Sequence, residues 1–266
     1  KPLTAVAIAQ LKEQGRRQFD DPVGRHIPEF AAGGKEAITL RHVLTHTGGF
    51  RDADKIPENV GWDETVRRVC ETPLEPGWIP GWQAGYHRSG SWFILGEVVR
   101  RLTGMSLGQH ARERILLPLG LPDTWLGVPG AEFHRYGERL GFMYLTQHSH
   151  TKPHPHWNSE AGSSLCRPGS NVRGPIRELG RFYEALLARR AGRSLSGNAL
   201  PGAETVMTMT TRQTLGLDDH TMRHPVDWGL GFYLRARHAG PEPTPYGYGP
   251  HASEDTFGHS GAQSSC

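Results

Sequence analysis

Two groups among the 15 histidines have spacings that could hold a metal ion. His42 and His46 lie four residues apart on a predicted helix, which places both imidazoles on one face, as in zinc sites. A denser group lies within residues 148–156. The first pair lacks the glutamate of an H-E-x-x-H motif, and no cysteine or carboxylate cluster completes the second. A metal-dependent hydrolase is therefore kept as an alternative, but we assign no residue as a metal ligand, and a solvated loop explains the second group better.

Hydrophobic periodicity predicts the helices that would position reactive side chains. Glycines and Ser106 mark their expected ends, because glycine suits a helix C-terminus and serine an N-terminus. The predicted helices cover residues 1–15, 38–44, 91–103, 106–117 and 176–192, and the second of them is expected to stop only at Gly48 and Gly49.

Two short strands and one long loop complete the predicted elements. Residues 228–234 and the stretch from residue 256 onward are rich in aromatic and apolar residues flanked by glycine, which favours strands. Residues 131–174 are rich in Gly, Pro, His and Ser with little periodicity, so we predict a long loop region there. Loops of this kind often border active sites.

The composition argues against several classes of protein. The net charge is +3, and basic residues are interspersed with acidic ones, so no nucleic-acid partner is expected. No stretch approaches the roughly 18 consecutive apolar residues of a membrane span. Cys70, Cys166 and Cys266 form no pairing pattern and are expected to be free thiols. The chain is therefore expected to be soluble, and its compartment, cytoplasmic or exported, stays open.

Three stretches carry a likeness to a known family. Residues 1–11 read KPLTAVAIAQL, residues 38–49 read ITLRHVLTHTGG, and residues 96–99 read GEVV. Together they resemble the serine β-lactamase and penicillin-binding-protein superfamily, in its class C, esterase-like and D-aminopeptidase-like branch, and the likeness covers nearly the whole chain. Members carry an S-x-x-K element at a helix start, a Y-x-N element on a loop and a K-T-G or H-x-G element on an edge strand.

The resemblance implies that Lys1 is the motif lysine, with the nucleophilic serine three positions before it. A serine hydroxyl is a weak nucleophile at neutral pH and needs a base. A lysine one helical turn later can accept its proton if burial or a neighbouring cation lowers the lysine pKa. We therefore expect Lys1 to be a catalytic residue.

Tyr86 occupies the tyrosine position of the Y-x-N element, and we expect it to move protons as a phenolate base or a phenol acid. His87 takes the middle position. Arg88 stands where the family has asparagine, which weakens the case for β-lactamase activity. Both residues are expected to contact the substrate.

His259, Ser260 and Gly261 match the H-x-G form of the third element. The resemblance implies a cation or hydrogen-bond donor at His259 that orients the substrate, and a glycine that lets the substrate lie against the strand. It also implies that the backbone N–H of Ala262 completes an oxyanion hole with that of the serine.

The fold that the resemblance implies is of the α/β (α+β) class: an antiparallel sheet flanked by helices, beside a mainly helical subdomain, as one domain over residues 1–266. The family's first strands precede the serine and its last strands follow the H-x-G element. The sheet is therefore expected to be incomplete within this chain, with the domain truncated at both ends.

The function that the resemblance implies is hydrolysis of a small-molecule ester or amide through an acyl-enzyme, without a cofactor. Arg88 and His259 favour an esterase over a β-lactamase. Penicillins, D-amino-acid peptides and other amides stay open as substrates. A catalytically inactive binding or regulatory homologue is the second alternative, because Arg88 replaces the asparagine and these residues contain no motif serine.

Overall fold

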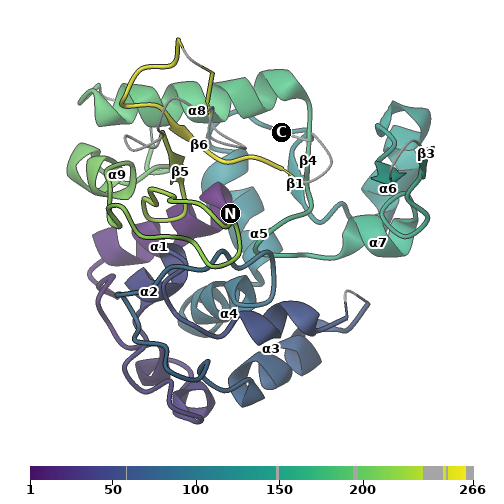
Figure 1. Ribbon diagram of the computed structural model, residues 1–266. Coiled ribbons are helices and arrows are strands. Elements are labelled where there is room, and N and C mark those ends of the chain that lie inside the picture. The colour runs from purple at the N-terminus through teal and green to yellow at the C-terminus, as the bar shows by residue number, and fades with distance from the viewer. Residues whose placement is uncertain (58, 148–149, 194–196, 236–247, 250, 262–266) are drawn as a thin grey trace.

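Helices dominate this protein, whose computed structural model describes residues 1–57, 59–147, 150–193, 197–235, 248–249 and 251–261 (Figure 1). The helices are α1 (Pro2–Glu13), α2 (Leu40–Leu44), α3 (Trp62–Glu71), α4 (Trp92–Thr103), α5 (Leu107–Ala111), α6 (Gly130–Tyr136), α7 (Glu160–Ser164), α8 (Ile176–Arg190) and α9 (Ala203–Met209). The strands are β1 (Trp125–Leu126), β2 (Tyr144–Gln147), β3 (His150–Pro153), β4 (Val172–Arg173), β5 (Tyr233–Leu234) and β6 (Phe257–Gly258).

Helix α1 lies at the centre of the molecule. Its residues from Leu3 to Leu11 are buried on every face, which is typical of a core helix. It packs against α4 and α5, and Figure 1 shows the N-terminus in the middle of the fold. The side chain at the start of α1 is consequently inside the protein: Lys1 is 8% exposed.

Helix α2 ends before His46, so the predicted pairing of His42 and His46 on one helix is wrong. Thr39 caps α2 by accepting a hydrogen bond from the His42 N–H, and the Thr39 N–H donates to His42 Nδ1. His46 follows the end of the helix with a φ of +58°, in the left-handed region. His42 is therefore part of the helix and His46 is not, so the two imidazoles do not share one helix face.

The described strands pair two by two, and all three pairs are antiparallel: β1 with β4, β2 with β3, and β5 with β6. In the last pair Tyr233 lies opposite Gly258 and Leu234 opposite Phe257. This register places His259, the next residue after β6, beside the start of β5. The mixture of helices and small antiparallel sheets agrees with the predicted fold class.

The predicted loop over residues 131–174 is wrong in part. That stretch contains most of α6, together with α7, the β2–β3 hairpin and β4. Figure 1 shows α6, α7 and β3 on the right and β4 beside β1. These elements are short, and the strand β3 is exposed along its whole length, so they carry little of the hydrophobic periodicity that reveals longer elements.

The predicted strand over residues 228–234 is also shorter than expected. The Gly229 N–H donates to the Phe232 carbonyl, which makes a tight turn, and β5 contains Tyr233 and Leu234 alone. Gly231 has a φ of +80°, outside the extended region. Helices α3 and α9 were not predicted.

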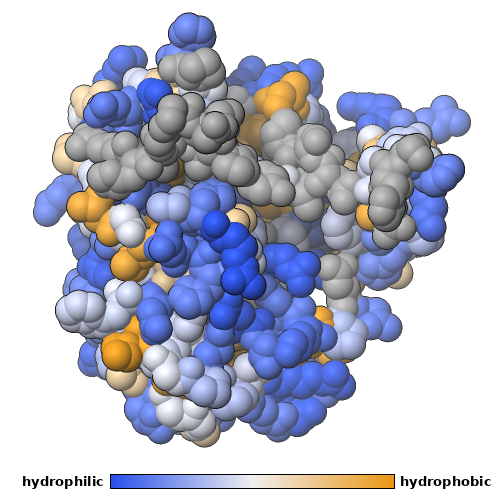
Figure 2. Space-filling model, viewed as in Figure 1, coloured by the Kyte–Doolittle hydropathy of each residue, from blue (hydrophilic) through white to orange (hydrophobic). Residues whose placement is uncertain are grey.

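The face of the molecule seen in Figure 1 is mainly polar where its residues are described. Figure 2 shows hydrophilic residues over most of the face seen in Figure 1, with hydrophobic residues in small separate groups. Among the helices that the structure describes, none combines the length and the apolar character that crossing a bilayer requires.

Gly231 fixes the approach of the Trp228–Tyr233 turn to α1, which gives a stability prediction. A Cβ added there would lie 2.5 Å from the Ala5 Cβ, in addition to the unfavourable φ. We expect Gly231→Ala to lower the free energy of unfolding by about 2–4 kcal/mol. Gly104→Ala is the control, because its φ is +71° but no atom lies within 4 Å of the added Cβ, and it should cost about 1 kcal/mol. Equal losses in denaturant unfolding of the two variants would contradict this account.

Candidate active site

The Lys1 ammonium group makes three hydrogen bonds within the core. Lys1 Nζ donates to Tyr86 Oη at 2.9 Å, to the Arg88 carbonyl at 2.8 Å and to the Gly169 carbonyl at 3.0 Å. An ammonium group has three N–H donors, so each has an acceptor. The structure thus brings together Lys1 and Tyr86, which lie 85 residues apart in the sequence.

Burial changes the protonation of Lys1. It lowers the pKa of the ammonium group to about 7, and the negative charge of Asp54 opposes this change. Removal from water destabilises the charged form of an amine, which is the physical cause. At neutral pH Lys1 is consequently neutral in a substantial fraction of molecules and can accept a proton.

The Tyr86 phenol responds to burial in the opposite direction. Burial raises its pKa far above the ordinary value, and the carboxylates of Asp54 and Asp219 add to this, while the positive charge of Arg88 opposes it. Its ring stacks on Trp228 with centroids 5.6 Å apart and the planes at 7°. Tyr86 is therefore a neutral phenol at neutral pH, whereas the sequence left phenolate and phenol both open.

Side chains hold the loop that carries Tyr86. Five consecutive backbone N–H groups, from residue 86 to residue 90, donate to side-chain acceptors. Asp219 accepts from Tyr86 at 2.9 Å, and His46 Nδ1 accepts from His87 at 3.1 Å. Because this backbone is fixed in place, the Arg88 carbonyl and the Tyr86 hydroxyl are both held toward Lys1.

Asp54 makes the remaining three of these contacts. Its carboxylate accepts from the N–H groups of Arg88 at 2.6 Å, Ser89 at 2.9 Å and Gly90 at 2.7 Å. It lies in the 3-10 turn Arg51–Lys55, labelled η3 here. The sequence did not identify Asp54, since its partners lie 34 to 36 residues away and no local motif marks it.

Asp219 and Gly169 were missed as well. Asp219 is 1% exposed and also accepts hydrogen bonds from the backbone N–H groups of Thr221 and Met222. Gly169 supplies the second of the two backbone carbonyls that accept from Lys1. The sequence marks Gly169 only by the Pro-Gly dipeptide, which predicts a turn. This dipeptide does not predict a contact with Lys1.

His87 lies in the core, away from the position expected for a substrate contact. It is 1% exposed, and its ring centroid lies 4.9 Å from that of Phe50. Burial lowers its pKa to about 4, so the ring is neutral. His46 is fully buried, and its ring contacts both Tyr86 and Trp228, with centroid distances of 4.8 Å and 4.4 Å.

His259 reaches the same cluster from the end of β6. Its ring centroid lies 6.1 Å from that of Tyr86. Nδ1 is 2.7 Å from the Ser260 carbonyl, and since a carbonyl can only accept, Nδ1 carries the proton. Burial, with the charge of Lys1 as the second cause, lowers the His259 pKa well below its ordinary value. The ring is thus neutral with a buried acceptor at Nε2, which differs from the cation or donor expected there.

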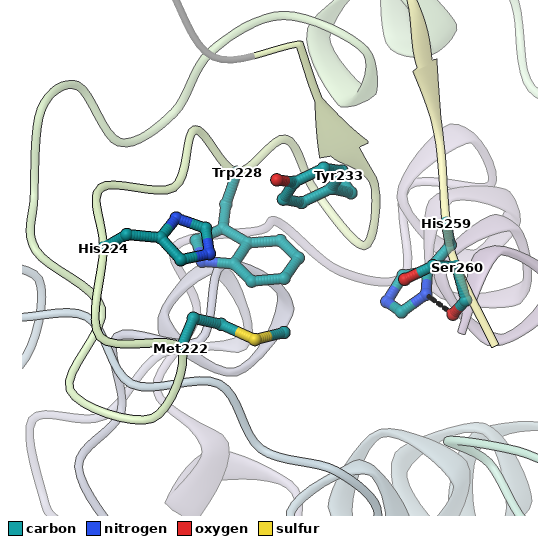
Figure 3. A pocket seen from close by; sticks show the side chains of 6 residues that line it. All are labelled: Met222, His224, Trp228, Tyr233, His259 and Ser260. Carbon is teal, nitrogen blue, oxygen red and sulfur yellow. Dashed lines mark hydrogen bonds between the residues drawn. The ribbon is translucent and has the colours of Figure 1, made fainter. Parts of the chain in front are cut away.

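A small pocket opens beside this histidine. Figure 3 shows Met222, Trp228 and Tyr233 on one side of it and His259 with Ser260 on the other, together with the hydrogen bond between the last two. Ser260 and Gly261 are exposed. Ala262 lies outside the described residues, so the expected oxyanion donor has no described position.

The side chain of Arg88 is exposed, although its backbone is engaged at both ends. Among the described residues, no group of three or more His, Cys, Asp or Glu side chains could hold a metal ion. His154, from the second histidine group, accepts a hydrogen bond from the Trp157 N–H and stacks on that ring at 4.5 Å.

Comparison with known proteins gives a consistent set of relatives. The family described as Beta-lactamase matches residues 1–266. "Esterase EstB" of Burkholderia gladioli is 30% identical over 260 residues, which cover 87% of this chain and 64% of that protein. The chain therefore spans less than two thirds of the length of this relative.

Two solved structures share the fold. A family VIII carboxylesterase has a TM-score of 0.77 with 28% identity, and a penicillin-binding protein homologue from Caulobacter crescentus has a TM-score of 0.74 with 27% identity. In both cases the match covers 97% of this chain and 69% of the other. The likeness extends to both the esterase and the penicillin-binding-protein branches of the fold.

The contact between Asp54 and the loop gives a prediction for Lys1. The Asp54 carboxylate stabilises the ammonium form, so Asp54→Asn should lower the Lys1 pKa further below about 7. NMR titration of lysine labelled at the ε-carbon measures this directly. Asp52→Asn is the control, because Asp52 lies in the same turn, is exposed and pairs with Lys55 at 2.8 Å. An unchanged or raised Lys1 pKa in Asp54→Asn would contradict the assigned role.

Proposed function

Since the chain belongs to the beta-lactamase family, we propose that the protein is a serine hydrolase that cleaves small esters or amides through an acyl-enzyme. The observation that carries the proposal is the partly buried hydrogen bond of 2.9 Å between Lys1 Nζ and Tyr86 Oη. It joins an amine with a lowered pKa to a phenol with a raised one. Two groups whose pKa values are shifted apart in this way are suited to base and acid roles.

The nucleophile in this proposal is the serine that the S-x-x-K motif places three positions before Lys1. Neutral Lys1 accepts the proton of the serine hydroxyl as the serine oxygen attacks the carbonyl carbon. The C–O bond to the leaving group then breaks. Tyr86 gives its proton to the leaving oxygen and receives one from the Lys1 ammonium through their hydrogen bond, so Lys1 ends the step neutral.

Hydrolysis of the acyl-enzyme uses the same two groups in the same order. Lys1 accepts a proton from water as the water oxygen attacks the ester carbon, and the serine oxygen leaves with a proton returned through Tyr86. The backbone N–H of Ala262, with that of the serine, is the proposed oxyanion hole. His259, which lines the pocket, offers Nε2 as a hydrogen-bond acceptor. His87 has a structural role, because its ring packs in the core.

An ester is the favoured substrate, and we treat residues 1–266 as one domain. "Esterase EstB" and the family VIII carboxylesterase support the choice of ester. The replacement of the motif asparagine by Arg88 supports it as well, because a β-lactam would lose an amide partner. One hydrophobic cluster extends from Leu3 to Phe257, which supports a single domain.

The test of this function is turnover by the whole protein. We expect hydrolysis of 4-nitrophenyl acetate and much slower hydrolysis of a penicillin. The base must be neutral, so kcat/KM for the ester should fall as the pH drops through the Lys1 pKa of about 7 and level off above it. Absence of ester hydrolysis, or a rate that does not change between about pH 5 and 8, would contradict the proposal.

Removal of the Tyr86 hydroxyl tests the acid role. Tyr86→Phe should lower kcat by about 100- to 10,000-fold, the usual contribution of a positioned acid–base group, with little change in melting temperature. Tyr136→Phe is the control: this buried tyrosine of α6 bonds to Asp123, and its loss should leave kcat within about twofold. If Tyr86→Phe fails to fold while Tyr136→Phe folds, Tyr86 is a core residue and the acid role is lost.

A further inference from the structure

Arg88 carries a free positive charge at the site. Its side chain is exposed and makes no ion pair or hydrogen bond with the described part of the chain. Other arginines differ from it: Arg51 pairs with Glu75 and Arg212 with Asp227. The Arg88 guanidinium therefore has its donors available for a partner from solution.

The backbone of Arg88 fixes where that charge is. The carbonyl accepts from Lys1 Nζ at 2.8 Å, and the N–H donates to Asp54 at 2.6 Å. These backbone contacts hold residue 88 next to the catalytic lysine in every conformation of its side chain. The guanidinium also lies within electrostatic reach of the Tyr86 hydroxyl, since its charge lowers the pKa of that group.

No carboxylate among the described residues forms an ion pair with this guanidinium. Both carboxylate oxygens of Asp54 accept hydrogen bonds from backbone N–H groups of residues 88–90 instead. Asp219 is bound to backbone N–H groups on the other side of the loop. His46 and His259 are neutral, because burial lowers the pKa of each. The two carboxylates keep their charges but are bonded within the fold, whereas the Arg88 side chain is exposed and its donors are available to an anion from solution.

We propose that Arg88 determines specificity by binding a carboxylate of the substrate, so that esters with an anionic group near the scissile bond are preferred over neutral ones. A planar guanidinium can form two parallel hydrogen bonds to a carboxylate, which a neutral asparagine in its place cannot do with equal strength. The inference rests on the proposed hydrolase function.

A pair of matched esters tests the specificity. We would compare 4-acetoxybenzoate with 4-acetoxybenzamide, which share the scissile bond and differ in one charged group. The ratio of their kcat/KM values, anionic over neutral, should fall by about 10- to 100-fold in Arg88→Gln, as expected for loss of a charge-assisted hydrogen bond, and less in Arg88→Lys. Comparing ratios between variants removes the intrinsic reactivity of each ester.

Arg114→Gln is the matched control, since Arg114 is also exposed and lies in the separate π-helical segment Arg112–Leu116. Its ratio should equal that of the unmodified protein. An unchanged ratio in Arg88→Gln, with both esters hydrolysed, overturns the inference while the hydrolase function stands. Failure of the unmodified protein to hydrolyse either ester overturns the proposed function instead.

A second measurement needs no variant and covers the case in which Arg88→Gln does not fold. Benzoate and benzamide have the same shape and differ in charge. Benzoate should inhibit hydrolysis of the neutral ester competitively, with an inhibition constant about 10-fold lower than that of benzamide. Equal inhibition by the two compounds would overturn the proposed anion preference.

Discussion

The burial of one lysine ammonium group at the start of the central helix is the constraint on which the rest of the site depends. Lys1 is 8% exposed, and a charge removed from water must be paired or satisfied by hydrogen bonds. Three acceptors meet this need, and two of them are backbone carbonyls, of Arg88 and Gly169. The protein thereby holds an amine with a pKa of about 7 where a proton acceptor is useful at neutral pH.

Keeping those acceptors in place requires the surrounding loops to be rigid. The loop of residues 86–90 has little regular structure of its own, and side chains from three other segments accept its backbone hydrogen bonds. Asp54 serves both needs, because it binds the loop and its charge stabilises the ammonium form of Lys1. Asp219 ties the same loop to the turn that leads to Trp228, on whose ring Tyr86 stacks.

The sequence predicted the parts of this arrangement that local patterns encode. The helices around Lys1 and Trp92 have long hydrophobic stretches, and the side chains at the motif positions Lys1 and Tyr86 lie within hydrogen-bond distance. Asp54 was beyond prediction because its role exists through partners more than 30 residues away. The charge states of Tyr86 and His259 depend on burial, which spacing alone does not give. Helix α3 is different: its buried Val66, Val69 and Cys70 follow helical spacing, so a signal was present in the sequence.

The central claim is that Lys1 and Tyr86 exchange protons with a serine placed three positions before Lys1. A crystal structure of the whole protein after reaction with a fluorophosphonate tests it most directly. The account predicts a phosphorus atom bonded to that serine oxygen, with Lys1 Nζ and Tyr86 Oη still hydrogen-bonded to each other and Lys1 Nζ within about 3.2 Å of the serine oxygen. An adduct on any other residue, or a serine adduct that lies out of reach of Lys1, would contradict it.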